Sequence, residues 1–431
     1  MARSAAVRQR GQRTQARILL AARKEFGRGG FAGARIDNIA RRAGVNRSLI
    51  FYYFQNKEGL SRAVAAQRLA TYALPGTAGD GQDDHLLDWP LWLFGRGEET
   101  QDAVRYALAE GVNAERDRAS LHEAERRRAS FQEQVERVRA AQRAGRLAAD
   151  LDTAQLTFLL YVLGVYPYML PQGVYLITGR SVQDAAFRAS FEEFLRAFGR
   201  LLQQPRPAPG AQSVALEGVA GGPLPAAEGG DPTRARILAT ALEEFGRHGY
   251  RGARIEAIAR GAGVPRGLIA YYFTTKEGLF RALWTERLGV NERIQRQLQP
   301  GPDDPFAWSF RTFSGGQPTL DWVRMLIWEG LDWEERGDHD DGRLPLEDER
   351  LGFWRGRIPA VRHWQDQGKL PSNLDAEQLT FFLWVLGIYP YLVPQIAYLI
   401  TGGWPSSVAF RREFERLVRG VAARMATRSR C

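Results

Sequence analysis

Apolar residues recur at helical spacing near the start of the chain. Ile18, Ala22 and Phe26 follow one another at intervals of four, which predicts an amphipathic helix. This helix would begin at Thr14, whose hydroxyl would cap it, and would end at Gly29-Gly30. Residues 36–60, IDNIARRAGVNRSLIFYYFQNKEGL, then give two shorter apolar faces separated by the turn Ala-Gly-Val. Two short helices joined by a glycine-containing turn predict a helix-turn-helix, whose second helix, here called the reading helix, enters the DNA major groove.

The whole pattern occurs twice. Residues 255–279, IEAIARGAGVPRGLIAYYFTTKEGL, repeat the helix-turn-helix. Thr14 and Thr233, Phe26 and Phe245, and Lys57 and Lys276 are each 219 residues apart, and this offset holds to Gly111 and Gly330. Beyond that point the offset is 223, as for Tyr175 and Tyr398, so a net insertion of four residues is expected around residues 337–342. A period this long indicates a duplicated domain rather than a solenoid.

The remainder of each repeat also has a helical pattern. A helix from Lys57 leads away from the first helix-turn-helix, short apolar helices follow at 89–95 and 100–111, and a long charged helix at 114–143. Residues 151–179 and 374–403 are almost wholly apolar, long enough to raise the possibility of a membrane helix. Pro167 and Pro171 interrupt the first of these segments, and no cluster of Lys and Arg flanks it on one side. We therefore expect a kinked helix buried at a helix–helix interface, with membrane insertion as the alternative.

The predicted fold is all-α, with two tandem repeats in one chain. Residues 203–230 are rich in Pro, Gly and Ala and predict a linker. The predicted domains are 1–60 (first helix-turn-helix), 61–202 (first helical regulatory domain), 203–230 (linker), 231–279 (second helix-turn-helix) and 280–431 (second helical regulatory domain). A flexible linker of about 27 residues spans roughly 30 Å on average and about 90 Å when extended. Two reading helices on one DNA face lie roughly 34–36 Å apart per helical turn. The linker can therefore span the molecule, and the apolar C-terminal helices would have to set the spacing.

Composition and charge support nucleic-acid binding. The chain has 431 residues, of which 44% are hydrophobic and 25% charged, which excludes wholesale disorder. The net charge of +10 is concentrated on the two helix-turn-helix segments: residues 1–60 hold 13 Lys and Arg against 3 Asp and Glu, and residues 231–279 hold 8 against 5. Positive charge on the reading unit is the electrostatic footprint expected of a DNA-binding protein. The alternative is a solvated charged surface.

Several kinds of site have no support in the sequence. Cys431 is the only cysteine, so no intrachain disulfide or cysteine-based metal site is possible. The basic, polar start MARSAAVRQRGQR is not an apolar signal segment and favours a cytoplasmic protein. The glycines of GRGGFAG follow a helix and lack the dinucleotide-binding spacing. The five histidines are scattered; His339 beside three aspartates is the nearest approach to a cation site, and a solvated acidic loop explains it better. We expect no catalytic residues, no metal and no cofactor.

The capped first helix, the turn AGV, the segments LIFYYF and LIAYYF and the following KEGL resemble the TetR family of bacterial transcriptional regulators. The resemblance covers residues 14–60 and 233–279 specifically, and the rest of each repeat by layout. It implies regulators that are typically homodimers, in which the last two helices form a four-helix bundle and the body holds a small-molecule pocket. Two such units in one chain suggest a covalent pseudo-dimer that acts as a monomer on a double-stranded DNA operator; further self-association is left open.

The residues expected to read bases lie on the exposed first turns of the reading helices. They are Asn46, Arg47, Ser48, Phe51 and Tyr52 in the first repeat and Arg266, Gly267, Ala270 and Tyr271 in the second. Arginine can bind guanine bidentately, and an aromatic ring or alanine can contact the thymine methyl group. Pro265 replaces Asn46, and the family usually has Tyr where Phe51 and Ala270 stand. Because the two sets differ, we expect unequal half-sites and an imperfectly palindromic operator.

Phosphate contacts are expected from residues at helix starts. The candidates are Thr14, Arg35, Tyr53, Lys57, Thr233, Arg254, Tyr272 and Lys276. A threonine at a helix N-terminus lies where amides and dipole favour phosphate, and lysine supplies a point charge. Arg35 and Arg254 replace the Thr or Ser that the family often uses as a helix cap. Two alternatives remain open: the tyrosines pack between helices, and the arginine-rich first thirteen residues are a solvated tail rather than a DNA-binding arm.

A ligand pocket is the least defined expectation. The aromatic candidates for its lining are Trp92, Tyr106, Trp308, Phe313, Trp322 and Trp328. Aromatic residues in a helical bundle are usually core, but the resemblance favours a pocket for an apolar or aromatic effector, in the tryptophan-rich second repeat. The sequence therefore predicts a DNA-binding transcriptional regulator, most simply a repressor released by a small molecule. A ligand-independent architectural DNA-binding protein and a helical enzyme are the alternatives.

Overall fold

The computed structural model describes residues 2–72, 88–114, 121, 124–204, 231–297, 305–314, 317–333 and 343–426. The regular structure in these residues is entirely α-helical, which confirms the predicted fold class. Three predicted features lie outside them: residues 205–230 of the linker, the insertion at 337–342 and the acidic loop at His339. The first half contains α1 (Ala2–Gly33), α2 (Ile36–Ala43), α3 (Arg47–Phe54), α4 (Lys57–Tyr72), α5 (Asp88–Gly95), α6 (Glu98–Ala114), α7 (Ala124–Arg143), α8 (Thr153–Met169), α9 (Pro171–Thr178) and α10 (Ala185–Gln203).

The second half repeats this order with two helices broken. It contains α11 (Pro232–Gly252), α12 (Ile255–Ala262), α13 (Arg266–Phe273), α14 (Lys276–Gln297), α15 (Ala307–Ser314), α16 (Gln317–Trp333), α17 (Glu347–Arg355), α18 (Ile358–Asp366), α19 (Ala376–Leu386), α20 (Tyr389–Leu392), α21 (Pro394–Thr401) and α22 (Val408–Met425). Helices α17 and α18 together occupy the place of α7, and α19 and α20 that of α8. The long charged helix predicted at 114–143 begins at Ala124 in the described residues.

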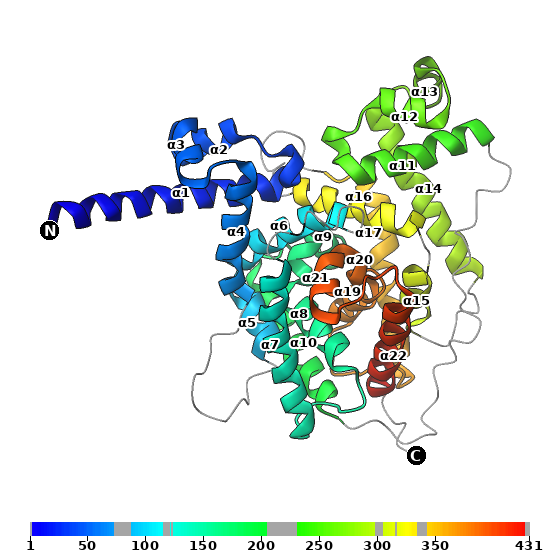
Figure 1. Cartoon of the computed structure of the whole chain (residues 1–431). Helices are drawn as coiled ribbons and strands as arrows, with labels where there is room; N and C mark the ends of the chain where they lie inside the picture. Colours follow the sequence, from blue (N-terminus) through cyan, green and yellow to red (C-terminus); the bar gives the residue numbers. More distant parts are fainter. Residues whose placement is uncertain are drawn as a thin grey trace.

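The two helix-turn-helix units lie at the same end of the molecule (Figure 1). We call α1–α3 head 1, α11–α13 head 2, and the remaining helices the body. Helix α1 packs across α6 and α11 packs across α16, while α4 and α14 lead from the heads into the body. Helices α6 and α16 contact each other between the heads, and α10 and α22 pair at the far end of the body.

The two halves of the body contact each other through a pseudo-twofold interface. The Gln172 Nε2 donates to the carbonyl of Leu326 at 2.9 Å, and the equivalent Gln395 Nε2 donates to the carbonyl of Ala107 at 2.6 Å. The aromatic contacts are reciprocal as well: the ring centroids of Phe158 and Tyr389 are 5.0 Å apart, and those of Phe381 and Tyr166 are 4.9 Å apart. Contacts that repeat with the partners exchanged are the signature of an isologous dimer interface, formed here within one chain.

Small residues allow the two glutamines to reach across this interface. A Cβ atom on Gly330 would lie 2.7 Å from the Gln172 Oε1, and one on Gly111 would lie 2.7 Å from the Gln395 Oε1. Both distances are shorter than van der Waals contact, so glycine is required in α6 and α16 for the side chains to fit. Both glutamines are fully buried, and their hydrogen bonds to backbone carbonyls fix the register of one half on the other.

The apolar segments form kinked, buried helices, as the sequence predicted. Helices α8 and α9 bend by 76° at Leu170, immediately before Pro171, while Pro167 lies inside α8. Every residue of α8 from Gln155 onward is buried. In the part of the chain that the structure describes, no single helix is long and apolar enough to cross a membrane; only the bent pair α8–α9 reaches that length and composition together.

The predicted start of the first helix is wrong for repeat 1. Helix α1 runs unbroken from Ala2 to Gly33, past the predicted end at Gly29-Gly30, and the Thr14 hydroxyl donates to the carbonyl of Arg10 at 3.0 Å instead of capping. Residues 2–13 are mostly Ala, Arg and Gln, which favour helix, and they contain no proline. In repeat 2, Pro232 occupies the first helical position and Asp231 caps the helix, so α11 starts one residue before Thr233. Gly249, the counterpart of Gly30, breaks the helical path with a φ of 69°.

Candidate nucleic-acid interface

Each head presents its reading helix on a small helical core. Gly44 and Gly263 adopt φ values of 61° and 65°, the left-handed conformation that ends α2 and α12 and turns the chain into the reading helix. Ile50 and Phe54 of α3, and Ile269 and Phe273 of α13, are buried in the heads. The opposite face of each reading helix is thereby left toward solvent.

One tyrosine on each reading helix is almost fully exposed. Tyr52 and Tyr271, which are equivalent positions, have relative exposures of 80% and 79%. Each ring is braced by the next tyrosine, with centroids 5.2 Å apart in both heads. Phe51 is half-buried, while Ser48, Gly267 and Ala270 are exposed. A large aromatic ring held in solvent on a rigid helix is a contact surface for a partner.

The arginines at the first turn of the reading helices are exposed and paired to the preceding helix. Arg47 lies 3.5 Å from the carboxylate of Asp37, and Arg266 lies 2.7 Å from that of Glu256. Exposed ion pairs contribute little stability, so a guanine edge can replace the carboxylate at small cost. Asn46 has a different role from the one expected: its Oδ1 accepts the backbone N–H of Leu49 at 2.8 Å and caps α3. Pro265 begins α13 without a side-chain cap.

Two of the predicted phosphate contacts have intramolecular partners in head 2. The Tyr272 hydroxyl donates to the carboxylate of Asp231, and this hydrogen bond lowers the pKa of Asp231 and raises that of Tyr272. Thr233 lies in the first turn of α11, where its backbone N–H donates to the Asp231 Oδ1 at 2.8 Å. Tyr53, the counterpart in head 1, is half-buried against the core, and Gln12 stands where head 2 has Asp231. The aspartate carboxylate would repel a phosphate at this point of head 2, so the two heads present different charge there.

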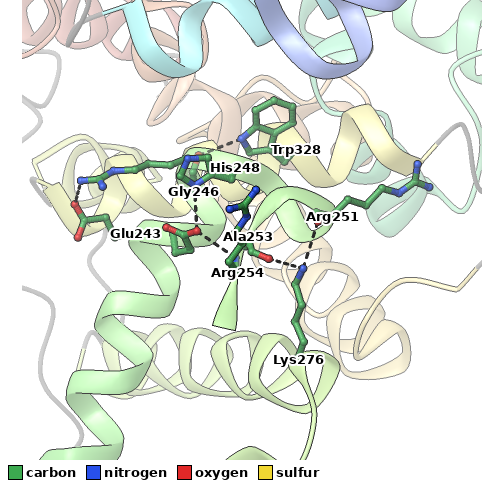
Figure 2. A network of polar contacts seen from close by, with 10 residues as sticks. Glu243, Gly246, His248, Arg251, Ala253, Arg254, Lys276 and Trp328 are labelled. Atoms are coloured by element: carbon green, nitrogen blue, oxygen red, sulfur yellow. Dashed lines mark hydrogen bonds and ion pairs between the residues drawn. The ribbon is translucent and has the colours of Figure 1, made fainter. Parts of the chain in front are cut away.

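The equivalent lysines Lys57 and Lys276 each contact the end of the first helix of their head. The Lys276 Nζ donates to the carbonyl of Ala253 at 2.7 Å (Figure 2). It also lies 5.0 Å from the ring centroid of Tyr250. The Lys57 Nζ lies 4.8 Å from the ring centroid of Phe31. Partial burial is the main cause that lowers the pKa of both lysines. These contacts give Lys57 and Lys276 a structural role within the heads that the sequence did not reveal.

A glutamate that the sequence analysis missed organises the second helix of each head. The Glu25 Oε1 accepts the backbone N–H of Arg35 at 3.3 Å and the side chain of Asn38 at 2.8 Å. In head 2 the Glu244 Oε1 accepts the backbone N–H of Arg254 at 3.2 Å. These carboxylates hold the backbone of the N-cap residues Arg35 and Arg254, and neither helix has a side-chain cap. The Arg35 and Arg254 side chains remain exposed, as a phosphate contact requires. The signal available was the recurrence of an acidic residue 219 positions apart, next to Phe26 and Phe245.

The heads are joined to the body differently. The buried residues of head 1 form a cluster of their own that includes Tyr106, whereas those of head 2 belong to the main core of the body. The Trp328 Nε1 of α16 donates to the carbonyl of Gly246 at 3.1 Å (Figure 2). The indole also packs on Gly249. Head 1 has the smaller Ala109 at the position of Trp328 and is tethered instead by Arg23 and Asp102, at 2.7 Å.

An aromatic cavity lies in the second half of the body, and most of its lining residues differ from those predicted for a ligand pocket. Its walls are Trp284, Arg287, Leu288, Thr312, Trp322, Leu326, Arg350, Phe353, Trp354, Trp384 and Ile388, and we call it the tryptophan cavity. Of the predicted residues only Trp322 lines it. Phe313 packs on Phe414 in the core, Tyr106 lies in the core of head 1, and Trp92 lies beneath Arg96. Trp328 does not line this cavity, because its indole joins head 2 to the body. The Trp308 side chain lies outside the described residues.

Comparison with known proteins identifies both heads. Residues 18–64 and 237–283 each match the family described as Bacterial regulatory proteins, tetR family, and residues 99–196 match the Tetracyclin repressor-like C-terminal domain. The chain is similar to the HTH-type transcriptional repressor SCO4008 of Streptomyces coelicolor, with 31% identity over 41% of this chain and 88% of that protein. It is also similar to the HTH-type transcriptional regulator RutR of Escherichia coli K12, with 40% identity over 42% of this chain and 85% of that protein. The solved structure of SCO4942 from Streptomyces coelicolor is 25% identical, with a TM-score of 0.35, over 43% of this chain and 97% of that one. Each of these matches spans about one repeat.

Proposed function

The chain belongs to the tetR family of bacterial regulatory proteins, and we propose that it binds a single operator with both of its unlike heads. The chain is a DNA-binding transcriptional regulator and not an enzyme. In this proposal it acts in the cytoplasm as a repressor, with one polypeptide in the place of a homodimer. The observation that supports it best is the reciprocal body interface of Gln172 and Gln395, with both heads at one end of the body.

The side chains on the two reading helices support unequal half-sites. Both helices carry an exposed tyrosine and an arginine at equivalent positions, so each half-site would share one pattern of contacts. They differ at Ser48 and Gly267 and at Phe51 and Ala270, where head 2 has lost side-chain bulk. Direct contacts to base edges decide sequence preference, so we expect the stronger preference in the half-site of head 1.

Helix α14 supports release of DNA by an effector. Its first turns pack against head 2, where Leu279 is buried. Further along, the helix supplies Trp284, Arg287 and Leu288 to the tryptophan cavity. Because a helix transmits displacement along its axis, a ligand that moves these side chains would move the reading helix α13 that immediately precedes α14. An effector that binds the displaced form more tightly than the DNA-binding form would lower DNA affinity. The decrease is at most the ratio of its affinities for the two forms.

Selection of bound sequences from a random duplex pool tests this function. We expect an enriched site with two half-sites of unequal information content, centred roughly 34–36 Å apart or at a multiple of that spacing. Arg47→Ala should relax preference in one half-site and Arg266→Ala in the other, each at a cost of about 1–3 kcal/mol. Arg416→Ala, which removes an exposed arginine at the far end of the body, is the matched control. A perfectly symmetric site with equal losses would contradict unequal reading, and enrichment of no sequence would favour an architectural DNA-binding protein.

A further inference from the structure

The tryptophan cavity lies between α14, α16, α17 and α19 in the second half of the body. Trp284 and Trp322 meet edge to face with centroids 4.3 Å apart, and Trp354 and Trp384 are also 4.3 Å apart. The cavity volume is about 30 Å³, which accommodates a water or two but not an aromatic ring. A ligand the size of an aromatic ring must therefore separate the indoles, and one of them, Trp284, belongs to α14.

One of the two arginines in the cavity wall is fully neutralised. The Arg350 Nη1 and Nη2 donate to the two carboxylate oxygens of Glu329 at 2.8 and 2.7 Å, and both side chains are buried. The Arg350 guanidinium also lies 3.5 Å from the ring centroid of Trp284. A bidentate pair of this kind has no net charge to offer a ligand. Its counterpart in the first half is the buried pair Arg127 and Glu110, so this element is common to both halves.

The second arginine, Arg287, has no acidic partner among the described residues. Its Nε is shielded from solvent without a hydrogen-bond acceptor, and its guanidinium lies 5.3 Å from the ring centroid of Trp322. The Trp284 Nε1, one turn earlier on α14, is also enclosed without an acceptor. Desolvation lowers the pKa of Arg287 to about 10, which still leaves it protonated at neutral pH. Arg287 is half-buried, so its unpaired guanidinium at the cavity wall can bind an anion that the described part of the chain does not supply.

We propose that the tryptophan cavity binds a planar aromatic molecule with one carboxylate, which pairs with Arg287 while the indoles stack on the ring. This inference rests on the effector-controlled regulation proposed above and names the chemical class of the effector. An aromatic cation is disfavoured, because Arg287 would repel it and Glu329 is already occupied by Arg350. A neutral aromatic molecule would fill the cavity but would leave Arg287 unpaired.

The first half lacks the means to bind the same molecule. Ala65 and Ala103 stand at the positions of Trp284 and Trp322, and Phe131 and Tyr161 at those of Trp354 and Trp384. All four indoles are thus absent, and two of the four positions have no aromatic ring, although Arg68 stands at the position of Arg287. One ligand per chain follows, and it acts on α14 and head 2 directly.

Isothermal titration of the full chain with benzoate, naphthoate, neutral naphthamide and cationic naphthylmethylammonium tests the proposal. We expect naphthoate to bind at one site per chain and naphthamide and the cation at least tenfold more weakly. Arg287→Gln should weaken naphthoate by about tenfold to hundredfold, the range for losing a hydrogen bond to a charged group. Arg287→Lys should lose less, and Arg281→Gln, an exposed change on the same helix, should lose nothing.

A stability readout separates loss of a binding group from loss of the fold. Arg287→Met removes an unpaired, half-buried charge, so it should keep or raise the midpoint of thermal unfolding while it abolishes the preference for naphthoate over naphthamide. The proposal is overturned if neither carboxylate binds, if the cation binds best, or if Arg287→Gln binds naphthoate as the native chain does. DNA binding by the ligand-free chain is measured independently; if it persists in any of these cases, the regulatory function stands and only the effector class is wrong.

Discussion

Replacing Arg266 and Tyr271 together with alanine is expected to weaken operator binding by about a hundredfold to ten-thousandfold. The two side chains are the exposed arginine and tyrosine of the second reading helix. Once head 1 is bound, the body holds head 2 near the same duplex, so its binding is intramolecular and multiplies the affinity. Without head 2 the chain retains only the affinity of one head. Fluorescence anisotropy with a labelled operator duplex at fixed salt concentration measures the loss.

Two controls make this result specific to the heads. Arg47→Ala with Tyr52→Ala should cause a loss of the same order, and each double variant should abolish protection of a different half-site. Arg416→Ala, a change of an exposed arginine on α22, should leave the affinity within about twofold of the native chain, because α22 lies at the end of the body opposite the heads and salt screens distant charges. A loss below about tenfold for either double variant would mean that the heads do not bind one duplex together.

Arg350→Met is expected to lower the free energy of unfolding by about 3–5 kcal/mol. Both oxygens of Glu329 are hydrogen-bonded to Arg350, and the pair is buried between α16 and α17. Methionine fills much of the volume but leaves the carboxylate buried without its partner. The cost is therefore the desolvation of an unpaired charge rather than the net value of the pair. Urea unfolding monitored by circular dichroism measures it.

The double variant Arg350→Met with Glu329→Leu should recover most of this loss, because apolar residues of similar volume often replace a buried ion pair without cost. Arg416→Met breaks an exposed pair with Glu413 and should cost no more than about 1 kcal/mol. Equal effects of Arg350→Met and Arg416→Met would show that the Arg350–Glu329 pair contributes nothing particular to the body.

The sequence predicted the elements whose signals are local or periodic. The helix-turn-helix units follow from the apolar spacing and from Gly44 and Gly263. Each glycine marks one tight turn, a local feature that sequence alone can indicate. The bend before Pro171 follows from the loss of a backbone donor in an uncharged segment. The duplication was visible as an offset between residues, and the reciprocal contacts of Gln172 and Gln395 are its three-dimensional consequence.

Features that depend on contacts distant in sequence were not predictable in this way. Trp328 has the composition of a pocket residue, and only the packing of α16 on α11 shows that it joins head and body. Thr14 has the chemistry of a cap, but the helix continues through it because no competing residue stops it. Lys276 carries a charge suited to phosphate, yet two backbone carbonyls lie within its reach. In each case the residue type allowed several partners, and tertiary structure selected one.

The difference between the two halves has a physical consequence for regulation. Phe280, Trp284 and Trp328 fill the junction of head 2 with the body, where head 1 has Ser61, Ala65 and Ala109. Head 2 is therefore continuous with the core that contains the tryptophan cavity, whereas head 1 is attached through Tyr106 and the partly buried pair of Arg23 and Asp102. We expect ligand binding in the second half to displace head 2 more than head 1.

The mass of the complex formed at saturation on one operator duplex tests the central claim most directly. Native mass spectrometry should find one chain per duplex that carries both half-sites, with no further chain added while free protein is in excess. Two chains on that duplex, one for each half-site, would contradict the claim that a single polypeptide supplies both heads to one operator.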